Sequence, residues 1–153
     1  METKIHFSSA SGDWSTPQDF YDMLNEEFHF TLDPCADDHN HKCENYYTEA
    51  QDGLKQDWSG ETVFCNPPYG RTISRWVEKA YNEVYRGECS CVVLLVPART
   101  DTRWFHEYIY HKSEIRFIRK RLKFGSSKQN APFPSMIVIY RGISNRKEGE
   151  DNG

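Results

Sequence analysis

The stretch CSCVVLLVPA, residues 89–98, decides the fold class of this 153-residue chain. From Cys91 to Val96 its side chains are apolar without interruption. Such a strand is typical of a sheet that helices cover on both faces. The residues before it, TISRWVEKAYNEVYRG (72–87), carry apolar side chains at helical spacing and end at Gly87. Because TVFC (62–65) precedes that helix as a short apolar strand, the order strand, helix, strand predicts an α/β fold.

The rest of the chain extends this alternation. A cap at Ser15 or Thr16, with Pro17 at the first helical position, predicts a helix that ends near Phe28. Apolar residues then alternate up to Asp33-Pro34, which predicts a strand ending in a turn. Farther along, the patterns predict a short helix at 100–111, a strand with a basic extension at 114–124, a loop at 125–135 and a last strand at 136–142.

These elements predict a compact Rossmann-like sheet, mostly parallel, with an antiparallel C-terminal edge. One domain would span residues 13–143, between a flexible arm at 1–12 and a charged tail at 144–153. No apolar run is long enough to cross a membrane, and the N-terminus has no apolar signal core. The expected protein is therefore soluble and cytoplasmic, with no membrane partner.

Charge is divided unevenly along the chain, although the net charge is only −4. Residues 1–70 hold 3 Lys and Arg against 14 Asp and Glu, whereas residues 71–147 hold 16 against 6. A basic half of this kind is typical of proteins that bind nucleic acid. The alternative is that the two halves pair with each other in the folded protein.

Five cysteines form an odd set, which favours free thiols over a disulfide framework. Cys35, His39, His41 and Cys43 invite a zinc interpretation. Their C-x3-H-x-H-x-C spacing differs from the usual paired zinc ligands, so we expect no metal site.

Polar turns follow three of the predicted strands, at 33–35, 66–69 and 97–99. Ligands of open α/β sheets bind beyond the carboxyl ends of strands. The turn Asn66-Pro67-Pro68-Tyr69 suits a flat ring that carries an amine. The Asn66 side-chain oxygen and a backbone carbonyl beside Pro67 could accept its two N–H groups, which stabilises the positive charge that grows during methyl transfer. Tyr69 could stack on the ring.

Eight ordered blocks carry a family resemblance across residues 13–141: WSTP, LDPCA, NHKC, DGLKQDW, NPPYGR, PARTDTRWFH, RLKFG and APFPS. Together they resemble the small phage-type DNA N6-adenine methyltransferases, relatives of Dam. The resemblance implies a class I methyltransferase fold and an adenine-specific DNA methyltransferase that uses S-adenosyl-L-methionine. It also implies a phage or prophage protein in the cytoplasm of a bacterial host, where it could belong to restriction-modification, and it makes residues 66–69 the catalytic turn.

The resemblance further implies a set of cofactor contacts. An N-terminal segment and the end of the predicted strand at 28–33 would lie near the methionine part, and Asp52 would bind the adenine amine. The implied contacts are Trp14, Thr16, Pro17, Asp33, Pro34, Cys35, Ala36, Asp52 and Asn66. Unlike most methyltransferases, the DPCADDHN segment (33–40) has no glycine. Asp37, Asp38 and Glu44 all remain candidates for the ribose hydroxyls.

DNA contacts are expected from the basic half. Alternate residues of the basic strand extension would share one face and could follow phosphates, although a solvated edge strand has the same pattern. The predicted contacts are Arg71, Arg99, Arg119, Arg121, Lys123 and Lys128. Double-stranded DNA with a flipped adenine is the expected substrate, single-stranded DNA would also serve, and a homodimer would enlarge the small footprint.

Two other functions fit the same residues. An NPPY turn also suits the amide of a protein glutamine, and the missing glycine turn would fit a DNA-binding module without activity. The basic half favours DNA over a protein acceptor, and binding of the methyl donor would argue against the inactive module.

Overall fold

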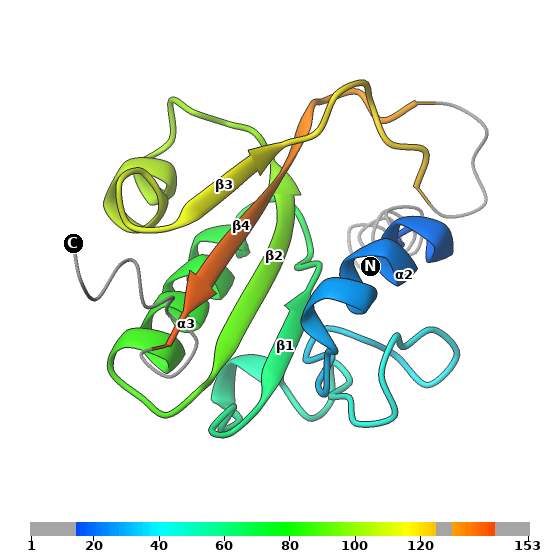
Figure 1. The fold of residues 1–153 in the computed structure, drawn as a ribbon, viewed down its shortest axis with the longest axis vertical. Helices are drawn as coiled ribbons and strands as arrows, with labels where there is room; N and C mark the ends of the chain where they lie inside the picture. Colours follow the sequence, from blue (N-terminus) through cyan, green and yellow to red (C-terminus); the bar gives the residue numbers. More distant parts are fainter. Residues whose placement is uncertain (1–14, 125–129, 143–153) are drawn as a thin grey trace.

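The computed structural model describes residues 15–124 and 130–142. Its sheet has the strand order β1-β2-β4-β3, and helices α2 and α3 cover its opposite faces (Figure 1). The elements in chain order are α2 (Gln18–Phe28), the 3-10 turn η1 (Gly53–Lys55), β1 (Thr62–Cys65), α3 (Ile73–Tyr85), β2 (Cys91–Pro97), the π-helical turn η2 (Phe105–Ile109), β3 (Glu114–Phe117) and β4 (Ser135–Arg141). The α/β class is confirmed.

The sheet is mixed, which corrects the expected mostly parallel arrangement. Among the strands of the described residues, β1 and β2 form the one parallel pair, whereas β4 is antiparallel to both β2 and β3. The expected antiparallel C-terminal edge is present, with β3 as the outermost strand and the last strand, β4, next to it inside the sheet. Apart from Arg141, β4 is buried from end to end, so it needs neighbours on both sides, while the more polar β3 tolerates the edge.

The expected strand at 28–33 is reduced to isolated bridges, Leu32 to Val63 and Asp33 to Tyr46. Helix α2 continues to Phe28, and His29 then adopts a left-handed conformation with φ of 57°. This conformation ends the helix and turns the chain sharply. Phe28 is therefore helical, and its ring stacks on the Phe30 ring with 5.7 Å between the centroids.

Strand β2 is buried along its whole length, as its sequence predicts. Alternate side chains divide between the two cores: Val92, Leu94 and Val96 pack on the α3 side. Cys91, Val93 and Leu95 pack on the α2 side. Trp76 and Trp104 are buried in the α3-side core, as expected of tryptophans on apolar helix faces.

Three local expectations need correction. Pro17 is the N-cap of α2 and not its first helical residue, and no side chain caps this end. The helix expected at 100–111 is only the five-residue turn η2. Strand β3 ends at Phe117, so the basic residues after it do not share a strand face. The left-handed φ of 71° at Lys120 breaks any regular extension there.

Residues 15–124 and 130–142 contain no helix long and apolar enough to span a membrane. The arm at 1–12, Trp14, Lys128 and the tail at 144–153 lie outside the described residues.

Candidate active site

A pocket of about 350 Å³ opens beside the carboxyl end of β1. It brings together segments that are far apart in sequence: the residues before α2, the loop after Leu32, the turn before η1 and the turn after β1. The predicted site residues that line it are Thr16, Asp33, Pro34, Cys35, Ala36, Asp52, Asn66 and Pro68. Pro17, Pro67 and Tyr69 are not among its lining residues.

Asn66 stands where β1 leaves the sheet, and hydroxyl groups lie on both sides of its carboxamide. Its Nδ2 donates to Thr16 Oγ1 over 3.0 Å. The Tyr69 hydroxyl donates to Asn66 Oδ1 over 3.0 Å and lies 3.4 Å from the Leu95 carbonyl oxygen. The side chain is therefore held in a defined position on the pocket wall.

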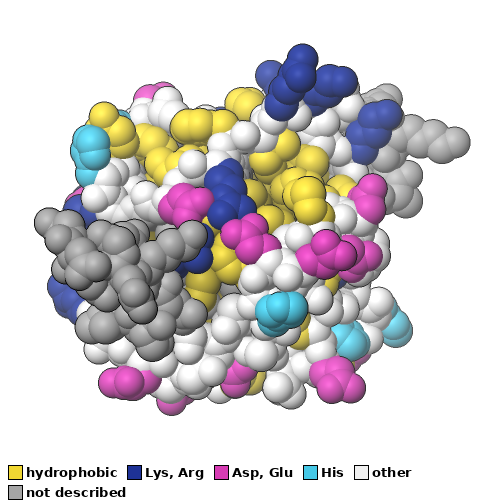
Figure 2. Space-filling view, viewed as in Figure 1, with side chains coloured by type: hydrophobic (Ala, Val, Ile, Leu, Met, Phe, Trp, Pro, Cys, Tyr) yellow, Lys and Arg dark blue, Asp and Glu magenta, His cyan; other side chains and the backbone are white. Residues whose placement is uncertain are grey.

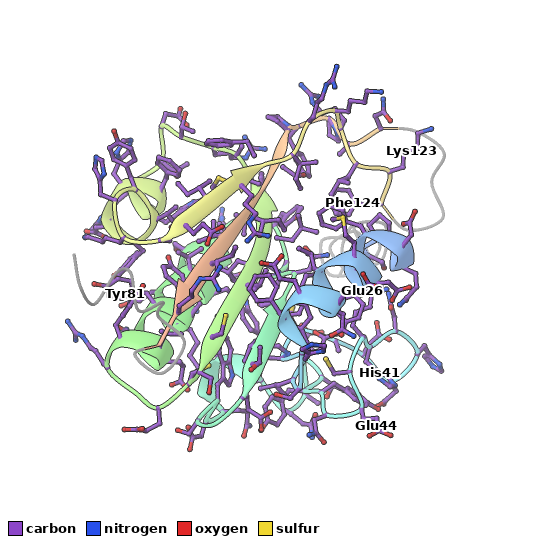
Figure 3. All side chains as sticks on the ribbon, in the orientation of Figure 1. Glu26, His41, Glu44, Tyr81, Lys123 and Phe124 are labelled. Atoms are coloured by element: carbon purple, nitrogen blue, oxygen red, sulfur yellow. The ribbon has the colours of Figure 1, made fainter. Side chains whose placement is uncertain are left out.

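Tyr69 packs inward against two aromatic rings. Its ring meets Phe133 and Phe124 edge to face, with centroid distances of 5.3 and 6.2 Å. Phe124 belongs to the α2-side core, and its place beside that helix is visible in Figure 3. Burial raises the pKa of the Tyr69 hydroxyl well above its usual value, so the group stays protonated and can donate.

Asp33 organises the loop that forms one side of the pocket. Its carboxylate is 5% exposed and accepts hydrogen bonds from the backbone N–H groups of Cys35 and Lys42, at 3.3 and 2.9 Å. Burial raises the pKa of Asp33, and the two N–H groups oppose that rise. Asp33 thus closes the loop from 35 to 42 through backbone contacts.

A glycine from another segment packs closely against the 33–40 segment. A Cβ on Gly53 would lie 2.1 Å from the Pro34 carbonyl oxygen and 3.0 Å from the Trp76 ring. The close backbone approach therefore depends on Gly53. Asp52 adopts a φ of 57°, and its carboxylate accepts from Leu54 N over 3.1 Å. Asp52 is thus both a turn residue and a pocket residue.

Charge in the pocket is mostly negative. Among the described residues, four carboxylates line it together with one cation, Lys42; the carboxylates are those of Asp33, Asp37, Glu49 and Asp52. Lys42 Nζ donates to Gln18 Oε1 over 3.0 Å, and desolvation lowers its pKa. The sequence interpretation missed Lys42 and Glu49. Lys42 lies within the NHKC block, but only the Asp33 contact to its backbone reveals its place.

Of the three ribose candidates, only Asp37 lines this pocket. Asp38 and Glu44 line a separate, more open depression. Asp38 accepts from the Tyr46 hydroxyl over 2.8 Å, and Figure 3 shows Glu44 and His41 on the same loop. His41 stacks on Tyr46, and the described residues hold no cluster of three or more metal-ligating side chains.

The predicted DNA contacts within the described residues are all exposed: Arg71, Arg99, Arg119, Arg121 and Lys123. None of them forms a salt bridge in the described part of the chain. Basic side chains gather at the edge where the segment after β3 runs (Figure 2). The Arg99 guanidinium lies 5.9 Å from the Phe133 ring centroid, next to the ring that contacts Tyr69.

Arg116 behaves differently from the other basic residues. It forms a two-pronged ion pair with Glu27, at 2.7 and 2.8 Å, and also bonds Glu114. Charge pairing between the acidic and basic halves therefore occurs here, but it leaves the arginines beyond β3 exposed to solvent.

Comparison with known proteins defines the class. The family model described as "DNA N-6-adenine-methyltransferase (Dam)" matches residues 5–149. The chain is 29% identical over 149 residues to the DNA N-6-adenine-methyltransferase of Haemophilus phage HP1 (strain HP1c1), covering 92% of this chain and 85% of that protein. It is 32% identical over 111 residues to the DNA N-6-adenine-methyltransferase of Escherichia phage T1, covering 71% of this chain and 45% of that protein.

These matches define the chain as a DNA methyltransferase. The chain belongs to the DNA N-6-adenine-methyltransferase (Dam) family. The resemblance seen in the sequence is confirmed, and so is the expected activity, adenine-specific methylation of DNA. The alternatives of a protein glutamine acceptor and of an inactive DNA-binding module gain no support.

Proposed function

We propose that the protein transfers a methyl group from S-adenosylmethionine, bound in the 350 Å³ pocket, to an adenine N6 amine held at residues 66–69. The observation that carries this proposal is the position of Asn66. Its carboxamide lies on the wall of the pocket at the carboxyl end of β1, where parallel α/β sheets bind their ligands. The sheet is accordingly a compact version of the Rossmann-like class I methyltransferase fold.

The acceptor chemistry requires hydrogen-bond acceptors in fixed positions. The adenine amine is a poor nucleophile because its lone pair is delocalised into the ring. The Asn66 Oδ1 atom and the Pro67 carbonyl would accept its two N–H groups and stabilise the positive charge that develops on the nitrogen. Neighbouring prolines restrict the backbone, so these acceptors need little reorganisation.

The residues present fit the methyl donor, which supplies an activated methyl group on a sulfonium. The volume falls within the range of small-molecule sites. Gly53 lines the pocket and packs on the Pro34 carbonyl oxygen, where any side chain would collide. Pro34, Cys35 and Ala36 would face the methionine part, Asp52 the adenine amine, and Asp37 the ribose hydroxyls.

The negative charge of the pocket also favours S-adenosylmethionine over the product that remains after methyl transfer, because the donor carries one more positive charge. Loss of the methyl group turns a sulfonium into a neutral thioether, and the four lining carboxylates favour the sulfonium form. Lys42 is the one cation among the described lining residues, so we assign it to the carboxylate of the donor's methionine part. Together these charges would favour donor binding and product release.

The base must reach the turn from DNA. Flipping it out of the duplex costs a few kcal/mol, which stacking on Tyr69 would partly offset. Arg99 and the exposed arginines beyond β3 would contact phosphates, with Lys128 and Arg71 as further contacts, and double-stranded DNA is the proposed substrate.

A labelled-donor experiment tests this function. The protein is incubated with methyl-labelled S-adenosylmethionine and unmodified double-stranded DNA, and the DNA is digested to nucleosides. We expect the label in N6-methyl-2′-deoxyadenosine. Label on cytosine, or label only in the protein fraction, would refute the proposed acceptor.

A further inference from the structure

Thr16 makes an unexpected use of its hydroxyl group. Its position just before α2 predicts a helix cap, yet Pro17 is the N-cap and no side chain caps this helix. Thr16 is instead 5% exposed and accepts a hydrogen bond from Asn66 Nδ2 over 3.0 Å. The two residues are fifty positions apart in sequence, so this contact exists only in the folded protein.

The orientation of the Asn66 carboxamide matters for the proposed chemistry. An asparagine side chain carries an acceptor oxygen and a donor NH2 group at nearly equivalent positions, and a half-turn exchanges them. Only the oxygen can accept an N–H from the base. With the NH2 group facing the base, two donors would meet and the acceptor site would be lost.

The Tyr69 hydroxyl alone does not fix this orientation. That hydroxyl has a second acceptor within reach, the Leu95 carbonyl oxygen at 3.4 Å. If Tyr69 turns toward a base, as its stacking role requires, its bond to Asn66 Oδ1 is broken. Another contact must then hold the carboxamide while the oxygen is released to the base.

We propose that Thr16 is a positioning residue: it holds Asn66 Nδ2, so that Oδ1 faces the acceptor base when the Tyr69 hydroxyl leaves it. This inference rests on the proposed function and adds a residue to its catalytic turn. Because Thr16 and Asn66 both line the pocket, the same contact joins the donor site to the acceptor site.

Two substitutions separate this role from a general structural one. Thr16→Val keeps the branched shape and removes the hydroxyl, whereas Thr16→Ser keeps the hydroxyl. We expect the single-turnover rate of DNA methylation to fall about tenfold in Thr16→Val, as for a lost hydrogen bond of about 1.4 kcal/mol. Thr16→Ser should stay within about threefold of the unmodified protein. Donor affinity, measured by calorimetry without DNA, should fall clearly less than the methylation rate in Thr16→Val.

A spectroscopic measurement reports on the contact without activity. The side-chain NH2 signals of Asn66, assigned by their loss in Asn66→Ala, should shift in Thr16→Val and return in Thr16→Ser. Unchanged signals in Thr16→Val would overturn the proposal.

Three further outcomes decide the matter. A Thr16→Val rate equal to that of the unmodified protein would refute the positioning role alone. A loss of donor affinity as large as the loss of rate would make Thr16 a donor contact and would equally refute it. An unmodified protein that binds the donor but methylates no DNA would refute the proposed function, and the role of Thr16 in catalysis with it.

Discussion

The hydroxyl of Tyr69 donates a hydrogen bond to the carboxamide oxygen of Asn66, over 3.0 Å. This is the oxygen that an adenine amine would need. In the absence of a base, this oxygen therefore already has a hydrogen-bond partner within the turn, and the Tyr69 ring packs against Phe124 and Phe133. Base entry would exchange one hydrogen bond for another, which lowers the cost of exposing Asn66 Oδ1.

Substitutions at Tyr69 should separate the ring from the hydroxyl. Tyr69→Phe keeps the stacking surface, and we expect its methylation rate to stay within about threefold of the unmodified protein. Tyr69→Ala removes the surface, and since stacking contributes about 1–3 kcal/mol per base, the rate should fall by about tenfold or more. Single-turnover assays at saturating donor provide the measurement. Equal losses in both variants would show that the hydroxyl, and not the ring, is needed.

Lys42 should recognise the donor through its carboxylate. Calorimetry would compare S-adenosylhomocysteine with 5′-methylthioadenosine, which lacks the amino-acid part. We expect Lys42→Met to lower the affinity for S-adenosylhomocysteine about tenfold, as for a lost charge-assisted hydrogen bond. The affinity for 5′-methylthioadenosine should be unchanged. Lys55→Met, which changes an exposed lysine outside the pocket, is the matched control. An equal loss for both ligands would place Lys42 away from the carboxylate.

Gly53 should be required for the shape of the pocket. In Gly53→Ala the new methyl group meets the Pro34 carbonyl oxygen, so we expect the free energy of unfolding to fall by about 1–3 kcal/mol and donor affinity to fall with it. Gly60→Ala is the control, because Gly60 has a φ of 76° and open space around it. A side chain at this left-handed φ costs about 1–2 kcal/mol of stability, and the Gly60→Ala change does not alter the pocket. Thermal unfolding and calorimetry measure both quantities. Normal donor affinity in Gly53→Ala would contradict this role.

The exposed arginines beyond β3 should set the salt dependence of DNA binding. Replacing Arg119 and Arg121 with alanine removes two charges, so the slope of log K against log salt should flatten by about 1.8. The control replaces Arg75 and Arg86, two exposed arginines of the α3 segment, and should leave the slope unchanged. Fluorescence anisotropy of labelled DNA over a series of salt concentrations measures this slope. The same slope in both double variants would place the DNA elsewhere.

Much of the fold could be predicted because local patterns decide it. The apolar run of β2 and the helical spacing of α3 each specify burial without distant information. The strand expected at 28–33 does not form because His29 takes a left-handed conformation, which the sequence pattern does not indicate. The interior place of β4 depends on pairing with two strands, β2 and β3, and its sequence alone could not choose between centre and edge.

Those site residues could be predicted that follow the ends of neighbouring strands, because such ends meet at one edge of a sheet. The Leu32 bridge to Val63 sets Asp33 beside β1, so residues 33–36 and Asn66 line one pocket. Lys42, Gly53 and the use of Thr16 on Asn66 depend on contacts between distant loops, which spacing does not encode. The basic run at 119–123 was found from charge alone, but its expected strand geometry was wrong.

The central claim is that the Asn66 carboxamide activates the base beside the donor pocket, and Asn66→Ala tests it most directly. One protein sample should be measured for donor affinity by calorimetry and for DNA methylation by single turnover, with Asn82→Ala on α3 as the control. We predict methylation reduced by at least about a hundredfold, as when a donor of an oxyanion hole is removed, with donor affinity nearly unchanged. Methylation that persists in Asn66→Ala while Asn82→Ala is normal would contradict the account.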